Sequence, residues 1–327
     1  MKFGFRCTEG GRRFEAAKRE VQQAESVGFD SAWVSEHHGW NAKWPNSYVV
    51  LAGFAGVTDE ITLGTGITIL PQTNPVALAG AASLVDVVSD GRFVLGVGTG
   101  WRREEMENLG YDFETRGPRM TDHLRALRAI WEDGSTTYEG SFVSIEDFSV
   151  APVPVQDPRP PIWVGGGSEP ALKRAARLED GWLPSWRESF GDLQQKYDRY
   201  DELLDEAGAD DNSERSRPLL RVTCVDEDGD IARDNLRDLL GKMVQKYRAE
   251  GSTVPAAWEN AITGDLDSFA RDRFVYGTPS ECAAQIERYQ EAFGTDHVVL
   301  KVSTPTTNHE DVMDAVELLG DRLIGAY

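Results

Sequence analysis

The chain has 327 residues, of which 55 are acidic and 34 basic, for a formal net charge of −21 at pH 7. This length allows one large domain or two ordinary ones. The sequence has no basic stripe to replace the counterions of a nucleic acid and no apolar run that could span a membrane. Neither nucleic acid nor membrane is therefore an expected partner.

The acidic residues are spread along the whole chain, and only eight of the basic residues are lysines. A solvated acidic surface with few lysines predicts a protein adapted to high salt, as in halophilic archaea, because salt screens its self-repulsion. An ordinary acidic cytoplasmic protein is the alternative interpretation.

Cysteine usage and the N-terminus both indicate a reducing compartment. The three cysteines, Cys7, Cys224 and Cys282, lie far apart and form no CxxC pair, so neither a disulfide framework nor a structural zinc site is expected. The N-terminal segment MKFGFRCTEGG lacks the apolar core of a signal peptide and instead predicts a first strand. The expected location is the cytoplasm.

β-rich runs alternate with helical patterns along the whole chain. Strands are expected at residues 2–6, 31–35, 61–69, 92–98, 161–166, 181–186, 219–225 and 297–303. Helices are expected at residues 12–27, 46–57, 75–89, 116–132, 169–178, 188–207, 230–250 and 279–293. This alternation predicts an α/β fold, a (β/α)8 TIM barrel that forms a single domain over residues 1–327. A doubly wound sheet is the competitor, but no GxGxxG motif opens the first helix.

Two segments are insertions beyond the eight strand–helix units of a minimal barrel. Residues 134–150 predict a hairpin that turns at Glu139-Gly140. Residues 251–276 form a long insertion before the last expected helix, and such insertions in barrels often serve as lids. Several aromatic residues near the strand ends or in this insertion could line an apolar pocket or pack in the core: Trp40, Trp44, Trp101, Trp186, Trp258 and Phe269.

Glycine clusters end two of the expected strands. Active sites of barrels lie at the C-terminal strand ends, where this chain places Gly98-Thr99-Gly100 and Gly165-Gly166-Gly167-Ser168. Free backbone N–H groups at a helix start suit a phosphate, although glycines can also serve only for tight turns. Two clusters on one rim favour a phosphorylated cofactor.

The second expected strand ends in Glu36-His37-His38, in a chain with only five histidines. Adjacent residues at a strand end point to opposite sides, so only one of the two histidines can face the barrel mouth. A metal-dependent hydrolase would need three or more converging ligands. His123 falls within a helix and His297 at the wrong end of the last strand, which leaves only His309, and no metal is expected. A proton-handling histidine beside a cofactor is the favoured hypothesis.

Five segments of the chain carry a family resemblance. They are AESVGFDSAWVSEHH (24–38), ITLGTGITILP (61–71), DGRFVLGVGTGWRREEMENLG (90–110), PPIWVGGGSEPALKRAARLEDGWLP (160–184) and YGTPSECAAQIERYQEAFGTDHVVL (276–300). In these segments, and in their order and spacing, the chain resembles the bacterial luciferase-like oxidoreductases, which are barrels that use FMN or the deazaflavin coenzyme F420.

The resemblance implies roles for particular residues. His37 is implied as the catalytic contact beside the reactive ring. A non-proline cis peptide that backs the ring is implied at Gly66-Ile67. The remaining implied cofactor contacts are Glu36 against the ring system, Thr99 and Gly100 on a turn, and Gly166, Gly167 and Ser168 on the phosphate-proximal loop.

The sequence also departs from parts of the family. Deazaflavin-dependent sugar-phosphate dehydrogenases carry a glutamate as general acid where this chain has Trp101, and an aromatic residue that Trp40 and Trp44 only approximate. A sugar phosphate is therefore not the expected substrate. The light-emitting luciferases bind the FMN phosphate with an arginine at the position of Thr99, for which Arg102 could compensate. This difference favours F420 over FMN.

The resulting prediction is an oxidoreductase that transfers a hydride between F420 and a small organic substrate, with His37 moving the accompanying proton. An FMN-dependent monooxygenase that acts with oxygen is the main alternative. A barrel that binds a flavin without turnover, or a metal-dependent hydrolase, is a further alternative. A homodimer formed through early helices is expected.

Overall fold

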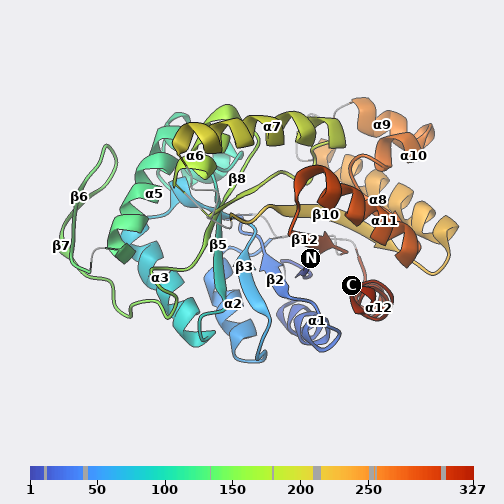
Figure 1. The fold of residues 1–327 in the computed structure, drawn as a ribbon, viewed down its shortest axis with the longest axis horizontal. Helices are drawn as coiled ribbons and strands as arrows, with labels where there is room; N and C mark the ends of the chain where they lie inside the picture. The colour runs from blue at the N-terminus through green and yellow to red at the C-terminus, as the bar shows by residue number, and fades with distance from the viewer. Residues whose placement is uncertain are drawn as a thin grey trace.

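The computed structural model describes residues 1–10, 13–39, 43–132, 134–178, 180–208, 215–249, 254, 256–302 and 307–327. Its parallel strands are β1 (Lys2–Arg6), β2 (Ser31–Val34), β3 (Thr62–Thr65), β4 (Thr68–Ile69), β5 (Phe93–Gly98), β8 (Ile162–Gly165), β9 (Gly181–Leu183), β10 (Pro218–Val225), β11 (Val275–Gly277) and β12 (His297–Lys301). They form one curled sheet in the order β11-β10-β12-β1-β2-β3-β5-β8-β9, with β4 paired to β5 (Figure 1). A parallel bridge between Gly181 and Ser216 links β9 to the chain just before β10. The predicted barrel is confirmed.

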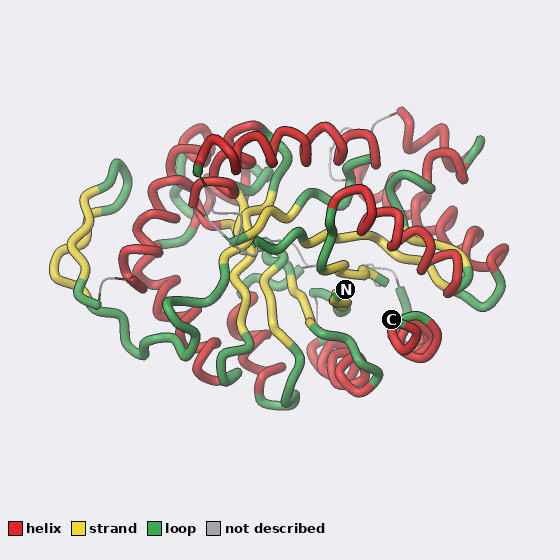
Figure 2. Tube along the Cα trace, viewed as in Figure 1, coloured by secondary structure: helices red, strands yellow, loops and turns green. Residues whose placement is uncertain are grey.

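Helices cover the outer side of this sheet (Figure 2). Those at expected positions are α1 (Phe14–Ser26), α2 (Ser47–Ala55), α3 (Pro75–Val88), α5 (Arg116–Glu132), α6 (Glu169–Leu178), α7 (Phe190–Ala207), α8 (Gly229–Ala249) and α11 (Pro279–Phe293). Four further helices were not predicted, namely α4 (Arg103–Asn108), α9 (Ala256–Thr263), α10 (Leu266–Ala270) and α12 (His309–Arg322). None of the described helices is long and apolar enough to cross a membrane.

Side-chain caps fix several of the expected helix starts. The Asn74 side chain accepts hydrogen bonds from two backbone amides of the first turn of α3, and Pro75 follows it. Thr278 and Glu281 form a reciprocal capping box at α11, where Pro279 opens the helix. These local signals explain why the starts of α3 and α11 could be predicted from the sequence.

The expected strand at 61–69 is interrupted in the middle. A cis peptide bond joins Gly66 to Ile67, so β3 ends at Thr65 and β4 begins at Thr68. The cis bond lies at the position implied by the family resemblance. The break brings the backbone of Gly66 and Ile67 to the C-terminal end of the barrel, where both residues line a cavity.

Aromatic side chains fill the lower part of the barrel. Trp33 stacks on Trp163 with ring centroids 4.8 Å apart, and an added Cβ on Gly64 would lie 2.3 Å from the Trp33 ring. His297 lies at the N-terminal end of β12, 2.7 Å from the hydroxyl of Ser31. Burial lowers the pKa of His297 to about 3, so the ring is neutral at ordinary pH. These described side chains pack the lower half of the barrel, and the cavity described below lies near its C-terminal end.

The first expected insertion is described in full and the second in part. The hairpin consists of β6 (Thr136–Glu139) and β7 (Ser144–Phe148), which pair antiparallel across a turn after Glu139. In the second insertion, residues 251–253 and 255 lie outside the described residues, and α9 and α10 follow. Trp258 of α9 is buried in an apolar cluster with residues of α8 and with Phe274. This described part of the insertion is packed core; a role as a lid stays a prediction.

The charge excess predicts a strong dependence of stability on salt. Exposed ion pairs such as Arg199 with Glu169 and Glu202 are weak individually and weaken further in salt. The net charge of −21 makes repulsion among the acidic groups stronger than the attraction within these ion pairs. Salt screens this repulsion, because the Debye length shortens from about 10 Å at 0.1 M to about 3 Å at 1 M salt. We expect the Tm, measured by circular dichroism, to rise by several degrees from low to molar KCl. An unchanged Tm over this range would contradict adaptation to high salt.

Candidate active site

A cavity of about 440 Å³ opens at the C-terminal ends of the barrel strands. Side chains or backbone from nearly every strand of the sheet line it, together with one residue of α8. The lining residues are Arg6, Ser35, Glu36, His37, Lys43, Gly66, Ile67, Ile69, Gly98, Thr99, Gly100, Trp101, Gly165, Gly166, Leu183, Pro184, Ser185, Trp186, Arg187, Leu220, Met243 and Lys301. A cavity at this end is where barrel enzymes place their chemistry.

Most of the predicted site residues meet in this cavity. Those that line it are Glu36, His37, Gly66, Ile67, Thr99, Gly100 and Gly166. Gly167 and Ser168 are not part of its wall. An added Cβ on Gly167 would lie 2.6 Å from Glu188, and the exposed Ser168 accepts backbone hydrogen bonds from the first turn of α6 with its carbonyl. The roles implied for all nine residues stay predictions.

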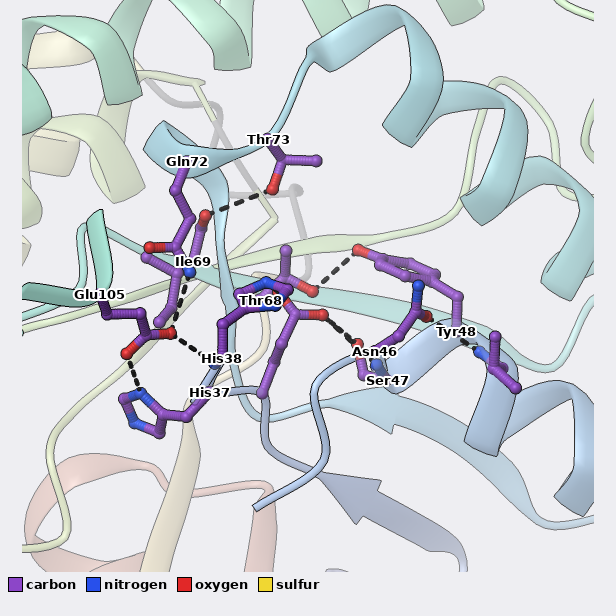
Figure 3. Close-up of polar contacts among 12 residues, drawn as sticks. His37, His38, Asn46, Ser47, Tyr48, Thr68, Ile69, Gln72, Thr73 and Glu105 are labelled. Carbon is purple, nitrogen blue, oxygen red and sulfur yellow. Dashed lines mark hydrogen bonds and ion pairs between the residues drawn. The ribbon is translucent and has the colours of Figure 1, made fainter. Parts of the chain in front are cut away.

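Glu105 of α4 holds His37 in place at the cavity wall (Figure 3). The Nδ1 atom of His37 lies 2.8 Å from Glu105 Oε2. The other oxygen, Oε1, accepts hydrogen bonds from the backbone N–H of His38 at 2.7 Å and from Gln72 Nε2 at 3.1 Å. Because Nδ1 faces the carboxylate, Nε2 is the ring nitrogen on the side away from Glu105.

Glu105 stays ionised although it is buried. Burial by itself would raise the pKa of Glu105, but the hydrogen bonds from His37, His38 and Gln72 outweigh this effect and leave the pKa lowered. The carboxylate therefore stays ionised beside His37. The sequence analysis missed Glu105, which lies five residues after Gly100 of the glycine-rich turn at the end of the fourth expected strand.

His38 takes a different direction from its neighbour. It is not part of the cavity wall, and its Nε2 lies 3.9 Å from Glu36 Oε1. Glu36 is buried and accepts hydrogen bonds from the backbone and hydroxyl of Ser47. Burial raises the pKa of Glu36 despite these contacts. The structure thus separates the two histidines as the strand parity predicts, with His37 on the cavity side.

Glycines and Ile67 build one wall of the cavity. An added Cβ on Gly98 would lie 2.0 Å from Ile67 Cδ1, and one on Gly165 would lie 3.3 Å from Ile67 Cγ2. The Ile67 side chain therefore rests on two strands that carry no side chain there. Gly100 adopts φ 71° and Gly166 φ 122°, which L-residues rarely adopt. A wall of exposed backbone with one apolar side chain can support a flat ring system.

A cluster of charged residues forms another wall. The buried carboxylate of Glu9 accepts hydrogen bonds from Arg6, at 3.2 Å, from Lys43 and from the backbone N–H of Ser35, at 2.7 Å. Burial opposes ionisation of Glu9, but Arg6, Lys43 and Lys301 lower its pKa well below the usual range. The sequence analysis did not identify any member of this cluster, because its residues are scattered from the N-terminus to the last strand.

Two tryptophans lie at the cavity. Trp101 is half-exposed and contacts His37 edge-on with ring centroids 6.1 Å apart. Trp186 packs against Trp258, which is not itself part of the wall. Of the other aromatic candidates, Trp44 and Phe269 pack in apolar clusters, and Trp40 lies outside the described residues. Arg102 lies 5.8 Å over the Trp101 ring and is not part of the cavity wall.

The histidines outside the cavity have structural partners. His123 contacts the carbonyl of Leu70 at 3.2 Å, and His309 pairs with Glu20 at 2.8 Å. Among the described residues, no group of three or more His, Cys, Asp and Glu side chains is arranged to hold a metal ion.

A barrel that presents a carboxylate-held histidine and a glycine wall to one cavity is built as a cofactor-dependent enzyme rather than as a binding scaffold. A family model described as luciferase-like monooxygenase matches residues 1–296, and the chain belongs to this family. Proteins of this family are F420- or FMN-dependent oxidoreductases or monooxygenases, so the expectation of a flavin-type cofactor is confirmed at that level.

The relatives include proteins named as flavin-dependent and proteins named as F420-dependent. The chain is 34% identical over 146 residues to the oxygenase component of a flavin-dependent trigonelline monooxygenase from Acinetobacter baylyi, over 44% of this chain and only 40% of that protein. It is 28% identical to an F420-dependent glucose-6-phosphate dehydrogenase from Kineococcus radiotolerans, over 85% of this chain and 84% of the relative. The structure of monooxygenase RslO1 from Streptomyces bottropensis matches with a TM-score of 0.87 and 23% identity over 100% of both chains, which supports the fold.

Proposed function

We propose that the protein is an F420-dependent oxidoreductase that transfers a hydride between the deazaflavin and a small organic substrate. One observation carries this proposal. His37, held by Glu105, and Ile67 with its neighbouring glycines line the same cavity. This arrangement supplies both parts of such a reaction: a surface for a flat ring and a proton carrier that a buried carboxylate holds in position.

In this reaction the cofactor and the residues of the cavity would have separate roles. Bound F420 supplies the carbon that gives or takes the hydride. Ile67 supports one face of the ring, and the backbone of Gly100 and Gly166 allows its close approach. His37 donates or accepts the accompanying proton at Nε2. Glu105 fixes the imidazole orientation through Nδ1.

An FMN-dependent monooxygenase is the second candidate. The similarity to the trigonelline monooxygenase component, named as flavin-dependent, favours it. Against it stands Thr99 at the turn where, by resemblance, the luciferases hold the FMN phosphate with an arginine. Arg102, the nearest replacement in sequence, lies over Trp101 and not at the cavity wall. The cavity residues therefore favour F420.

Equilibrium titration of the purified protein with oxidised F420 and with FMN, followed by absorbance and fluorescence, tests the proposal. Micromolar or tighter F420 binding, with FMN binding at least about tenfold weaker, is the expected result. The reverse order would replace the proposal by the monooxygenase. Binding of neither compound would overturn both candidates.

We further propose that the protein is a homodimer, with α2 and α3 as the interface. The two helices pack on each other and expose Val49, Leu84 and Val88, of which Val49 is 71% exposed. Helix α2 carries no charged residue, and Asp86, the acidic residue of α3, is buried. In a chain with a net charge of −21, this face is one where a second copy can approach without strong repulsion.

Val49→Asp is expected to shift the protein from dimer to monomer, because it places a desolvated charge twice in an isologous interface. Light scattering at molar KCl measures the mass of the wild type and the variant. Ile231→Asp, on the exposed face of α8, is the matched control and should leave the mass unchanged. A monomeric wild type, or a dimer that survives Val49→Asp, would contradict this interface.

A further inference from the structure

A fully buried arginine lies directly behind the cavity wall. Arg221 of β10 has no solvent-exposed surface. Leu220, the residue before it, lines the cavity, and adjacent residues of a strand point to opposite sides, so Arg221 points away from the cavity. The Nη1 atom of Arg221 donates hydrogen bonds to the carbonyl of Trp186, at 3.3 Å, and to that of Leu220, at 3.4 Å. Trp186 also lines the cavity, so Arg221 joins two parts of the wall from behind.

The other two nitrogens of the Arg221 guanidinium, Nε and Nη2, have no hydrogen-bond partner among the described residues. The ring of Tyr289, from α11, lies over the guanidinium with its centroid 4.8 Å from Cζ, and the buried Tyr289 hydroxyl has no described partner either. Arg174 is also buried, but its Nε donates to Thr121 and its Nη2 to the carbonyl of Gly117, both at 2.8 Å. Arg221 thus differs from Arg174 in having buried donors that still need an acceptor.

No described carboxylate forms an ion pair with Arg221, although the chain has 55 acidic residues. The carboxylates of this region have other partners: Asp201 pairs with Arg217 at 2.5 Å, and Asp296 accepts a hydrogen bond from the Arg217 backbone at 2.7 Å. Burial raises the pKa of Tyr197, and the positive charges of Arg217 and Arg221 oppose this shift. The charge of Arg221 therefore acts on its surroundings, and a buried charge of this kind is costly without a negative partner.

We propose that Arg221 binds a halide ion, with chloride as the physiological ligand, between its Nε and Nη2 atoms. These two atoms form one edge of the planar guanidinium, where two parallel N–H groups donate to the same acceptor. The complete burial of Arg221 favours a monatomic anion over a phosphate or an organic acid. This site lies behind the cavity and does not depend on which cofactor the protein uses. The ion would fix the arginine that holds Trp186 and Leu220 in the cavity wall.

The Tm in two potassium salts at equal molar concentration tests the proposal. Potassium chloride and potassium gluconate screen charges equally, but gluconate is too large for a site that is closed to solvent. We expect the wild-type Tm to be at least about 3 °C higher in chloride, because a ligand that binds only the folded state stabilises it. Arg221→Met removes the donors and the charge, and should reduce this difference to less than about 1 °C.

Arg174→Met is the matched control. It removes the same charge from another buried arginine whose Nε and Nη2 have partners, and should keep the full difference between the two salts. An equal difference in the wild type and in Arg221→Met would overturn the proposal, because water rather than a halide would then meet the donors. A wild-type Tm that is no higher in chloride would overturn it as well.

Crystals of the wild type grown in potassium bromide give a direct measurement that does not depend on whether Arg221→Met folds. Bromide occupies halide sites and scatters X-rays anomalously. We expect an anomalous peak within hydrogen-bond distance of Arg221 Nε and Nη2, and the lack of such a peak would refute the halide site. Cofactor titration remains a separate measurement: a protein that binds bromide at Arg221 but neither F420 nor FMN would refute the proposed function and keep this site.

Discussion

His37→Ala is expected to lower kcat by about 10²–10⁴-fold, the range for a lost acid–base group, while the affinity for the cofactor stays nearly unchanged. His37 lines the cavity through its ring, and Glu105 orients that ring from behind. Removing the imidazole takes away the proposed proton carrier but not the Ile67 wall on which the cofactor would rest. Steady-state kinetics and cofactor titration of the same variant separate these two effects.

His38→Ala is the matched control for this prediction. The His38 ring points toward Glu36 at 3.9 Å and is not part of the cavity wall, so its loss should cost much less turnover. Its backbone N–H, which binds Glu105, is kept in the alanine variant. Equal losses in the two variants, or full activity of His37→Ala, would remove His37 from its assigned role.

Glu105→Gln tests whether the carboxylate acts through His37. Glutamine keeps the shape and some hydrogen bonds but removes the charge, and a loss of about 10²-fold in kcat is expected. If Glu105 works only by positioning His37, the double variant with His37→Ala should be no slower than His37→Ala alone. Additive losses would mean that Glu105 has a separate structural role.

The barrel could be predicted because its determinants are local. Alternation of β-rich runs with amphipathic helices, and caps such as Asn74 and Thr278, are visible within short windows of sequence. The parity of a strand end also sufficed to predict that one of His37 and His38 faces the cavity. Helix α12 carries the same kind of local signal, with Asn308 as its cap and Val312, Val316 and Leu319 buried on one face, and was nevertheless missed.

The polar groups that surround the site could not be predicted in the same way. Glu105 meets His37 only when the ends of β2 and β5 come together, and Lys301 approaches Glu9 only when β12 pairs with β1. Such contacts join segments that are far apart in sequence, and a single sequence carries no signal for them. In the run Gly165–Ser168, Gly165 and Gly166 line the cavity, whereas Gly167 and Ser168 do not, and the cofactor contacts implied for these two residues stay predictions.

Gly96→Ala is expected to lower the free energy of unfolding by about 3–5 kcal/mol, in the range of severe packing defects. Gly96 lies in β5, and an added Cβ would be 2.0 Å from the carbonyl oxygen of Thr65, a backbone atom of β3. That oxygen has little freedom, because the Thr65 hydroxyl donates to the Gly96 carbonyl at 2.7 Å and β3 pairs with β5. The methyl group can be accommodated only by separating the two strands, which also displaces Ile67.

Chemical denaturation at molar KCl measures this effect. Gly241→Ala is the matched control, since nothing lies within 4 Å of its added Cβ in the middle of α8. This control should raise the free energy of unfolding by up to about 1 kcal/mol, because alanine is the better helix former. If the Gly96→Ala variant folds, its affinity for the cofactor should fall together with its stability, because the displaced Ile67 belongs to the wall that we propose for the ring. A Gly96→Ala protein as stable as wild type would show that β3 and β5 do not pack as closely as this contact requires.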